Sequence, residues 1–334
     1  MAPHFFPPMW EQRRICIARV LYDYGAQSVL EVGCGEGNVL TFLVPPAPDN
    51  RQPIIHLYGV DIRKDSLVAA RGRLVPEAHD YRSMRKDELR IELYHGDATV
   101  RIASVNADAV VCTEVIEHVD ECTGVPALTS VVLGAYRPRL AIFTTPNAEF
   151  NVNFAPLNYG KPDAKFRDED HKFEWTRAQF AAWAEDAAAR FGYSVELLPI
   201  GVKMRNAGAD FVECGGCTQM AVFERKEVAA SAEQTEAGCR EPVLLDAIEY
   251  PTHGRMQELV FDTVRSMGDA QASFQSNDLW AVLGIRQQFR HRSALETWLQ
   301  ANSGYASSML TKTRAKNGTA CYSIPQEYRA KMLQ

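Results

Sequence analysis

The stretch Ser28–Gly37, which reads Ser-Val-Leu-Glu-Val-Gly-Cys-Gly-Glu-Gly, decides the fold class. Its first five residues predict a short buried strand, and glycines follow at positions 33, 35 and 37. Glycine lets the backbone turn tightly and lets a ligand approach it closely. The stretch therefore predicts a strand, a glycine-rich loop and a helix, an arrangement with which α/β proteins bind nucleotide-like cofactors.

Two acidic residues further along the chain extend this pattern. Asp61 lies near the end of the apolar run Leu57–Ile62, where a carboxylate can accept hydrogen bonds from a ribose diol. Asp97 ends the run Ile91–Asp97, where it can accept a hydrogen bond from an adenine amino group. Each residue alone could be a turn residue or a helix cap. Their order, a glycine loop, a ribose acid and an adenine acid, resembles the pattern of class I methyltransferases that use S-adenosylmethionine.

Apolar runs alternate with amphipathic stretches over residues 1–224 and predict an α/β protein with a parallel, doubly wound sheet. Two late runs, Ser194–Ile200 and Thr218–Glu224, follow each other without a long helix between them, so we expect one antiparallel edge strand there. This is the Rossmann-like sheet of a class I S-adenosylmethionine-dependent methyltransferase, and we assign residues 1–224 to it.

Residues 225–242 are rich in Ala, Glu and Ser and predict a linker, after which residues 243–334 predict a smaller, mostly helical domain. Ser293 and Glu296 have the spacing of a capping box, and Asn317-Gly318 predicts a hairpin turn. Residues 251–334 hold ten Lys plus Arg against six Asp plus Glu. These features fit either a winged-helix-like domain that attracts phosphates or a helical cap on the catalytic sheet.

A cluster of potential metal ligands follows the fourth apolar run. In Thr113–His118 (Thr-Glu-Val-Ile-Glu-His), a helical turn would place Glu114, Glu117 and His118 on one face, and His171 is our candidate for a fourth ligand. Such a set can also be a solvated helix face. Carboxylates beside a cofactor pocket carry negative charge that a divalent cation would balance. Mixed oxygen and nitrogen ligands favour Mg²⁺, with Mn²⁺, Co²⁺ or iron as alternatives, and leave zinc open.

This ligand set predicts a specific chemistry. An octahedral ion with four protein ligands keeps two positions, which the adjacent hydroxyls of a ribose can fill. The ion would lower the pKa of a 2′-hydroxyl and orient it toward the methyl group, with His118 or His171 helping to take the proton. Only a 3′-terminal RNA nucleotide has both hydroxyls free. The catalytic residues would then be Glu114, Glu117, His118 and His171.

Composition limits the class of protein. The 334 residues and 46% hydrophobic content are typical of a folded protein of two domains. No apolar run approaches the roughly 18 residues of a membrane span, and the N-terminal segment lacks a secretory pattern. Eight cysteines without an even framework indicate a reducing compartment, so we expect a cytoplasmic protein. A net charge of −6 excludes a protein that is basic all over.

Several runs of the chain resemble the Hen1 family of small-RNA 3′-end 2′-O-methyltransferases, over about residues 5–224. These runs are the N-terminal segment Phe6–Arg13, the glycine loop, Glu114–His118, Phe143–Asn151 and Asp170–Arg177. The resemblance implies S-adenosylmethionine-dependent and Mg²⁺-dependent methylation of the 3′-terminal nucleotide of small single-stranded RNAs of the piRNA, siRNA or miRNA class. Such methylation protects the 3′ end in RNA-mediated gene silencing.

The resemblance also implies roles for individual residues. The metal ligands would be Glu114, Glu117, His118 and His171. The cofactor-binding residues would be Glu31, Gly33, Gly35, Asp61, Ile62, Asp97 and Thr113. The RNA-binding residues would be Arg13, Thr145, Pro146 and Asn147. Because the catalytic domain begins almost at Met1, with no double-stranded-RNA-binding unit ahead of it, the chain looks more like the animal type of the family, which acts on single strands held by an Argonaute or Piwi protein. We also expect a monomer.

Some segments depart from the family pattern. Where the family tends to have a proline-containing loop, this chain has Val202–Asn206, which puts the RNA path there in doubt. The segment after Glu224 does not match the shared catalytic domain. Cys214-Gly215-Gly216-Cys217 is a CxxC pair with no second pair nearby, so it predicts packing rather than a zinc or redox site.

Two other functions stay open at this point. The first is a metal-dependent O-methyltransferase that chelates a catechol or another small diol, which methyl transfer to catechol and to a short RNA would distinguish. The second is a catalytically inactive RNA-binding scaffold that keeps the fold. The intact candidate residues argue against the scaffold, since sequence drift would be expected to change them.

Overall fold

The computed structural model has two compact units, each made from two separate stretches of the chain. Unit 1 comprises Met1–Leu74 and Arg90–Ile248, and unit 2 comprises Val75–Leu89 and Glu249–Gln334. The structure describes residues 4–46, 51–77, 80–81, 84–202, 213–226, 241–266, 273–289, 291–303, 310–314 and 320–324. The Val202–Asn206 departure beyond its first residue, most of the predicted linker and the Asn317-Gly318 turn therefore lie outside the described residues.

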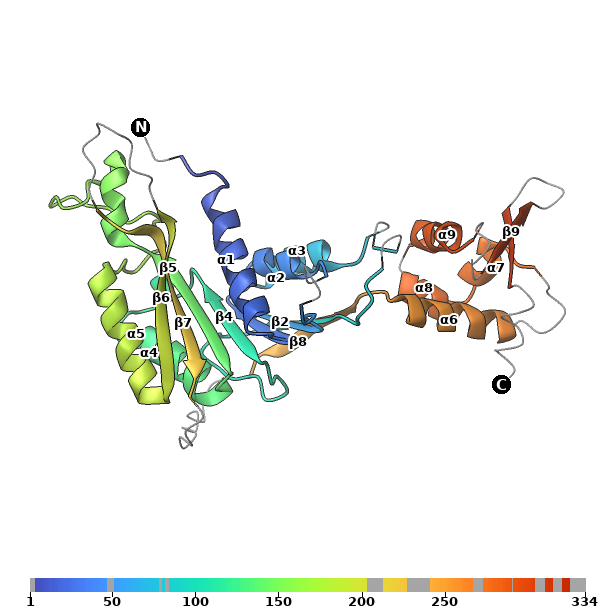
Figure 1. Ribbon diagram of the computed structural model, residues 1–334, viewed down its shortest axis with the longest axis horizontal. Helices are drawn as coiled ribbons and strands as arrows, with labels where there is room; N and C mark the ends of the chain where they lie inside the picture. Colours follow the sequence, from blue (N-terminus) through green and yellow to red (C-terminus); the bar gives the residue numbers. More distant parts are fainter. Residues whose placement is uncertain are drawn as a thin grey trace. The chain divides into compact units, whose positions relative to one another are not determined.

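Unit 1 contains an eight-stranded mixed sheet (Figure 1). The parallel strands are β1 (Ser28–Val32), β2 (His56–Asp61), β3 (Arg90–His95), β4 (Ala109–Thr113) and β5 (Leu140–Pro146). With β6 (Tyr193–Val202), β7 (Gly216–Arg225) and β8 (Val243–Glu249), they form the order β6-β7-β5-β4-β1-β2-β3-β8. The predicted α/β class, with a doubly wound sheet, is confirmed.

Both edges of this sheet differ from the prediction. Strand β7 is antiparallel to β5 and to β6, but it lies one place inside the sheet, so β6 forms the edge. The physical reason is burial, because residues 216–223 of β7 are all buried, as in a strand covered on both faces. At the other edge, β8 lies next to β3, although the sequence placed residues 243–249 in the second domain.

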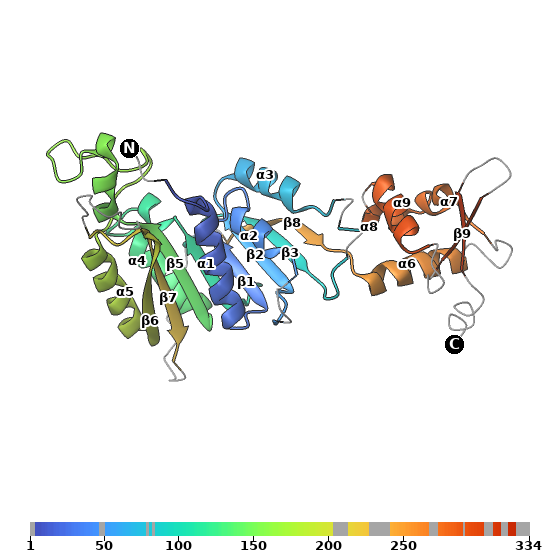
Figure 2. The ribbon, with the colours of Figure 1, turned by 45° about the horizontal axis from the view of Figure 1, so that its top comes forward.

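Helices cover both faces of the sheet (Figures 1 and 2). Helices α1 (Met9–Asp23), α2 (Asn38–Leu43) and α3 (Lys64–Leu74) lie on one face. Helices α4 (Gly124–Thr129), the π-helix η2 (Ser130–Tyr136) and α5 (Arg177–Phe191) lie on the other. Sequence sets the bounds of α5, since Thr176 and Gln179 form a capping box at its start and Gly192 ends it at a φ of 77°.

Unit 2 has its own apolar core. Its described elements are α6 (His253–Ser266), α7 (Ser276–Trp280), α8 (Leu283–Phe289), α9 (Arg292–Ala301) and the antiparallel pair β9 (Thr311–Arg314) and β10 (Ala320–Ser323). Trp298 is fully buried there beside Phe289. Tyr81, from the inserted stretch 75–89, stacks on Phe289 with ring centroids 5.3 Å apart and donates its hydroxyl to the Gln288 carbonyl at 3.0 Å. The insertion is therefore part of this core.

The capping box predicted at Ser293 is wrong. Helix α9 begins at Arg292, after His291, so Ser293 is already a helical residue. Glu296 pairs instead with Arg292 at 2.9 Å, one helical turn away. Spacing alone does not distinguish a residue at the N-cap from one at the second helical position.

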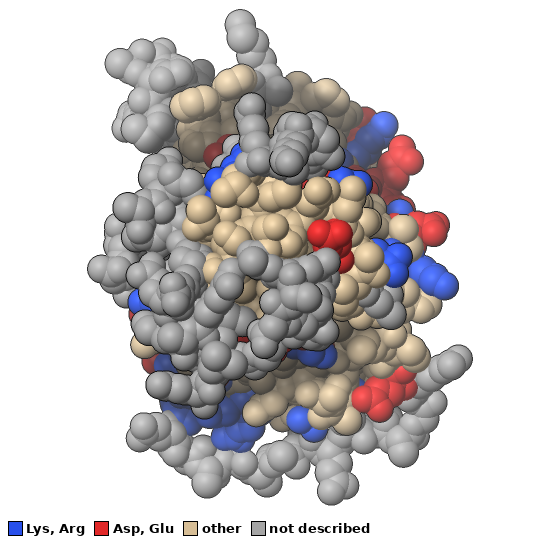
Figure 3. Space-filling view, turned by 90° about the vertical axis from the view of Figure 1, so that its right-hand side faces the viewer, with Lys and Arg blue, Asp and Glu red and all other residues tan. Residues whose placement is uncertain are grey.

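The surface carries charges of both signs. On the face drawn in Figure 3, the described Lys and Arg side chains are interspersed with Asp, Glu and uncharged surface. Among the described residues, no helix combines the length and the apolar character that a membrane crossing needs.

Candidate active site

The candidate residues follow the carboxyl ends of parallel strands, where doubly wound sheets bind their ligands. Strand β1 leads into the glycine loop, β2 into Asp61 and Ile62, and β4 into Thr113–His118. Strand β5, which pairs with β4, ends in Thr145 and Pro146. The topology thus brings four segments, far apart in the sequence, to one end of the sheet.

The glycines of the loop all have positive φ angles, 70° at Gly33, 52° at Gly35 and 71° at Gly37. Gly33 also lies against Val115, because a Cβ atom there would come within 2.6 Å of a Val115 methyl carbon. A Cβ atom at Gly35 would meet nothing within 4 Å. The loop therefore leaves room for a ligand at Gly35 and packs at Gly33 against the segment that carries the candidate metal ligands.

The two predicted cofactor acids make different contacts. Asp61 is 8% exposed and accepts hydrogen bonds from the backbone N–H groups of Gly35 at 2.7 Å and Arg63 at 2.8 Å, so it fixes the loop and keeps lone pairs for a ribose diol. Asp97 accepts from the backbone and the hydroxyl of Thr99, both through Oδ1 at 2.8 Å. Beside Asp61, the Ile62 side chain is 66% exposed and offers apolar surface to an adenine ring.

Two buried polar atoms lie near the ends of β1 and β4. Burial raises the pKa of Glu31 to about 8, and its Oε2 has no hydrogen-bond partner among the described residues. The Thr113 hydroxyl is also buried without a partner in the described part of the chain. Buried polar atoms are normally hydrogen-bonded, so both fit a site that a polar ligand completes.

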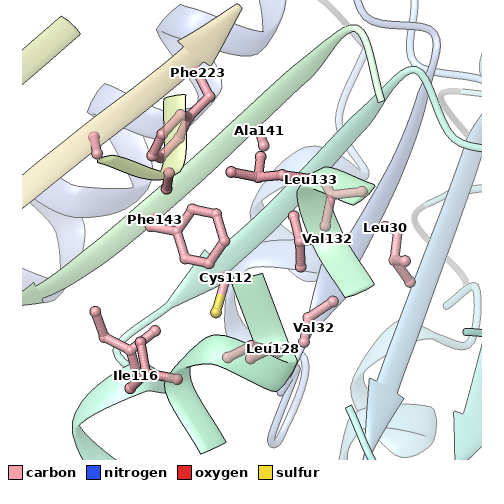
Figure 4. Close-up of a cluster of buried hydrophobic side chains, with 14 of the residues drawn as sticks. Leu30, Val32, Cys112, Ile116, Leu128, Val132, Leu133, Ala141, Phe143 and Phe223 are labelled. Carbon is pink, nitrogen blue, oxygen red and sulfur yellow. The ribbon is translucent and has the colours of Figure 1, made fainter. Parts of the chain in front are cut away.

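Glu117, His118 and His171 form the candidate metal cluster. One ligand atom from each lies within 4.8 Å of the others. Glu117 and His118 belong to the 3₁₀ turn η1 (Ile116–His118), and Ile116 anchors this turn in the core with Phe143 and Leu128 (Figure 4). The backbone N–H of Lys172 donates to the Glu117 carbonyl at 2.7 Å, which holds the His171 segment against the turn.

The Glu117 carboxyl group is fully buried. Burial, reinforced by the neighbouring Glu114, raises its pKa well above the ordinary range. Its Oε2 accepts a hydrogen bond from the Thr145 hydroxyl at 3.0 Å, whereas Oε1 has no partner among the described residues. A buried carboxyl oxygen without a partner, next to two imidazoles, fits a cation-binding site.

Glu114 is not one of the three residues whose ligand atoms lie within 4.8 Å of one another. Its φ is 52°, so it is not part of a helical turn, and the expectation that Glu114, Glu117 and His118 share one helical face is wrong. Its carboxylate pairs with Arg13 at 3.1 Å and accepts a hydrogen bond from the Thr144 hydroxyl at 2.9 Å. The ion pair with Glu114 thus places Arg13 of α1 at the edge of the site.

A second group of residues supports His171. The Nδ1 atom of His171 lies 2.7 Å from Glu174, which leaves Nε2 for a cation. Glu174 in turn accepts hydrogen bonds from Asn151 at 2.5 Å and from the backbone N–H of Arg167 at 2.7 Å. Burial opposes ionisation of Glu174, but these hydrogen bonds, above all that of His171, lower its pKa. A carboxylate behind a ligating imidazole fixes the ring orientation and raises its basicity.

Three of the four predicted RNA-binding residues are buried. Thr145 and Asn147 have no exposed surface, and Pro146 is buried between them. Thr145 holds Glu117, and the amide of Asn147 donates to the carbonyls of Cys214 at 2.7 Å and Gly216 at 2.8 Å. Thr145 therefore holds a candidate metal ligand, and Asn147 holds the start of the 3₁₀ helix η3 (Ala148–Asn153) against the Cys214–Gly216 segment.

Sequence reasoning missed several supporting residues. They are Thr144, which holds Glu114, and Asn151, Arg167 and Glu174, which hold His171. The available signal was local, since Arg167 and Glu174 flank His171 in a short polar run. The Asn147 and Cys217 carbonyls accept from Arg167 at 2.5 and 2.7 Å, and no spacing rule predicts such contacts. Cys214 and Cys217 are free and buried, as predicted for packing residues.

Comparisons with known proteins agree with this geometry. A family model described as a methyltransferase domain matches residues 30–136. The small RNA 2′-O-methyltransferase of the rat, Rattus norvegicus, is 32% identical over 256 residues, which cover 76% of this chain and 60% of the rat protein. The small RNA 2′-O-methyltransferase of the chicken, Gallus gallus, is 30% identical over 302 residues, which cover 90% of this chain and 72% of the chicken protein.

A solved structure shows the same fold. The methyltransferase domain of bacterial CtHen1 has a TM-score of 0.51 and 33% identity, and the match covers 65% of this chain and 100% of that domain. The chain spans only 60% of the length of the rat relative. The similarity to the chicken protein extends beyond the expected 224 residues, so it includes part of the segment after Glu224. The mixed sheet, the glycine loop and these similarities together show that the chain belongs to the small RNA 2′-O-methyltransferase family, on a class I S-adenosylmethionine-dependent methyltransferase fold.

Proposed function

We propose that this protein transfers a methyl group from S-adenosylmethionine to the 2′-hydroxyl of the 3′-terminal nucleotide of a small single-stranded RNA. The observation that carries the proposal is the placement of Glu117, His118 and His171 next to the glycine loop, at one end of the sheet. Methyl transfer to a ribose diol needs a methyl donor and a group that binds the diol side by side. The names of the rat and chicken relatives support RNA as the substrate class.

The donor set fits a divalent cation. We propose Glu117, His118 and His171 as ligands, with Glu114 as the fourth after it leaves Arg13. A bound cation would lower the pKa of the 2′-hydroxyl and orient both ribose hydroxyls. Imidazole ligands bind transition metals more strongly than Mg²⁺, so among Mg²⁺, Mn²⁺ and Co²⁺ the two histidines favour the latter two.

The chain's own residues position the reactants. Thr145 holds Glu117 and Glu174 holds His171, so the ligand atoms are oriented before substrate arrives. Asp61 and Asp97 would bind the ribose and the adenine of the cofactor. The methyl–sulfur bond breaks as the methyl–oxygen bond forms, and the hydroxyl proton passes to solvent water, with the His118 imidazole as the candidate base beside it. Arg13, once released by Glu114, would pair with a phosphate of the RNA end.

The proposal extends to the cellular setting. The substrate would be presented by an Argonaute or Piwi protein in RNA-mediated gene silencing, and the enzyme would act as a monomer in the cytoplasm. Seven described cysteines are free, which supports a reducing compartment. We propose unit 2 as a mostly helical accessory domain, winged-helix-like in its helices and hairpin, that adds affinity for RNA or for the partner protein.

A methylation assay with labelled cofactor tests the function. The substrates are three short single-stranded RNAs that differ only at the 3′ end, with a free diol, a 3′-phosphate or a 2′-deoxyribose, and catechol serves as the small-molecule control. We expect methylation of the free diol alone. Equal methylation of the 3′-phosphate RNA would exclude chelation of the diol. Methylation of catechol alone would indicate a small-molecule enzyme, and no product with any of the three cations would indicate a scaffold.

A further inference from the structure

A groove lies beside α1 and α2 and is lined by residues of both helices; the two helices cover the same face of the sheet (Figure 2). It has a volume of about 700 Å³. Its lining comes from the exposed side of α1, from α2 and from the segment that follows α2. None of the cofactor or metal residues discussed above lines it, so the groove needs a separate explanation.

The walls of the groove are basic. Arg14, Arg19 and Arg51 line it, and none of its described lining residues is acidic. The Arg19 side chain is 79% exposed. Asp23, outside the lining, pairs with Arg51 at 2.6 Å and with Arg19 at 3.7 Å, and such exposed pairs are weak. In a chain with a net charge of −6, three guanidinium groups around one groove form a local anion-binding surface.

Apolar and aromatic side chains complete the lining. Ile15 is 43% exposed and Phe42 is 36% exposed, and the half-buried Tyr22 belongs to the same lining. At the N-terminal end of α1, Trp10 is 49% exposed, and the Arg14 guanidinium stacks 4.4 Å from its ring centre. Exposed aromatic rings next to cationic side chains are the combination that binds single-stranded nucleic acids, because bases stack on the rings while phosphates meet the cations.

One lining residue of the groove, Arg14, follows directly after Arg13, which contacts the candidate active site. Trp10, Arg14, Ala18 and Tyr22 are spaced by four residues and therefore share one face of α1. Along the helix they span about 18 Å. Arg13, next to Arg14, pairs with Glu114 at the edge of the metal cluster. A strand that ends at Glu117 can thus continue along α1 into the groove.

We propose that this groove binds the single-stranded RNA segment immediately upstream of the 3′-terminal nucleotide. The inference rests on the proposed function, because it takes the RNA end to lie at the metal cluster. Charge complementarity favours a polyanion, and stacking on Phe42 and Tyr22 needs unpaired bases, which a duplex does not offer. The groove thereby selects a single-stranded 3′ segment of several nucleotides.

The test compares variants of the full chain. Arg19→Gln with Arg51→Gln removes two cations, and Phe42→Ala removes one stacking surface. The charge-matched control is Arg101→Gln with Arg190→Gln, outside the groove. RNA affinity is measured by fluorescence anisotropy of a 5′-labelled single-stranded RNA over a range of salt concentrations, cofactor affinity by calorimetry, and turnover on the same RNA and on a dinucleotide. Melting temperatures verify folding.

We expect the groove double variant to bind RNA about tenfold more weakly at low salt. Its plot of log affinity against log salt should be less steep by about 1.4, because two phosphate contacts are lost. Phe42→Ala should weaken binding about fivefold or more at every salt concentration. Cofactor affinity and turnover of the dinucleotide should stay within about twofold of the parent, since the groove lies outside the reaction centre.

The outcomes separate the groove from the proposed function. If the parent methylates RNA and the groove variants bind it with unchanged affinity and salt dependence, the groove does not bind RNA. If the parent binds RNA through the groove but methylates no 3′ end, the groove assignment stands and the proposed function fails. If the parent binds no RNA, both fail.

Discussion

Glu117 is the side chain on which the proposed chemistry depends most. It is fully buried and held by Thr145 through one oxygen, and the other oxygen has no partner in the part of the chain that the structure describes. Its turn is anchored in the core by Ile116 and tied to the His171 segment through Lys172. A charged Glu117 carboxylate is energetically unfavourable in this buried environment, and a bound cation would offset that desolvation energy. Glu117 therefore suits the role of a metal ligand better than a purely structural role.

Replacement of Glu117 or His171 by Ala should abolish methyl transfer and leave cofactor binding intact. The reason is that the metal cluster and the cofactor loop use different residues. Labelled-methyl transfer and calorimetry with the cofactor check the two halves of this prediction. A loss of cofactor affinity in either variant would show that these residues serve the fold or the cofactor pocket.

Glu174→Gln should lower metal affinity or activity by about 10- to 100-fold, because it removes the carboxylate that orients His171. Titration with Mn²⁺ or Co²⁺ measures the effect, and cofactor affinity should not change. Glu169→Gln, at an exposed position in the same segment, is the matched control. Equal metal affinity in both variants would leave Glu174 without a positioning role.

Glu31 should make stability depend on pH. Burial raises its folded-state pKa from 4.5 to about 8, so the folded protein keeps Glu31 protonated at pH values where the unfolded chain has ionised. The stability contribution is complete below pH 4.5 and is lost as pH rises to about 8, by at most about 5 kcal/mol. Cofactor-free Glu31→Gln should flatten this dependence in thermal unfolding between those pH values. Parallel curves for the two proteins would contradict it.

The role of a single residue could be predicted where it follows from the residue type and from its spacing in the sequence. The sequence named Glu117, His118 and His171, and these three meet in space. Its assignment of Thr145 and Asn147 to the loop beside the RNA end stays a prediction, and it did not foresee that Thr145 holds Glu117. It missed Thr144 because its partner Glu114 lies in another segment, and it missed Glu174 although His171 is only three residues away.

At the scale of elements, the cofactor loop and the turn η1 are packed together through Gly33 and Val115. Val115 lies between Glu114 and Glu117 in the sequence, so a change in the loop should disturb the metal cluster. The contact between Gly33 and Val115 therefore joins the cofactor loop to the segment that carries the candidate metal ligands.

Gly33→Ala should therefore weaken binding of the metal as well as of the cofactor. The new Cβ atom would stand 2.6 Å from Val115, in addition to the strain of a side chain at a φ of 70°. Gly35→Ala is the matched control, since its φ is also positive but a Cβ there meets nothing within 4 Å. It should lower cofactor affinity alone. Calorimetry with metal and cofactor on both variants checks this, and equal metal affinities would refute the coupling.

Elements with strong periodicity were predictable, and the sheet order at its edges was not. The parallel strands follow from buried apolar runs. Strand β7 lies between β5 and β6, and β8 lies beside β3. These positions depend on which neighbouring strand has unpaired backbone N–H and C=O groups, and a local sequence pattern does not show this. The capping box at Ser293 failed for a similar reason, since the preceding residue decides where a helix starts.

At the scale of the whole molecule, truncation after Glu224 should destabilise the protein. It removes β8 from the sheet beside β3, and it leaves Tyr81 without the Phe289 ring on which it stacks. Calorimetry should show a clearly lower melting temperature or an insoluble product. A truncated protein that melts like the parent would mean that β8 and unit 2 contribute little.

The control for this truncation is a second variant, which removes unit 2 and leaves unit 1 complete. It ends at Ile248 and replaces residues 75–89 by a short flexible linker, so that unit 1 stays complete and both parts of unit 2 are removed. We expect it to fold and to keep its affinity for the cofactor, while its affinity for RNA decreases if unit 2 binds RNA. Unfolding of this variant would show that unit 2 is a structural cap instead.

The insertion of residues 75–89 has a consequence for how the chain can be divided. The chain passes from one unit to the other three times, after Leu74, after Leu89 and after Ile248. A protease that cuts one of these crossings leaves the two units joined by another, so limited digestion will not release unit 1 in a single step. The catalytic unit is likewise not a continuous segment of the gene, and a fragment library made from consecutive codons will never contain it alone.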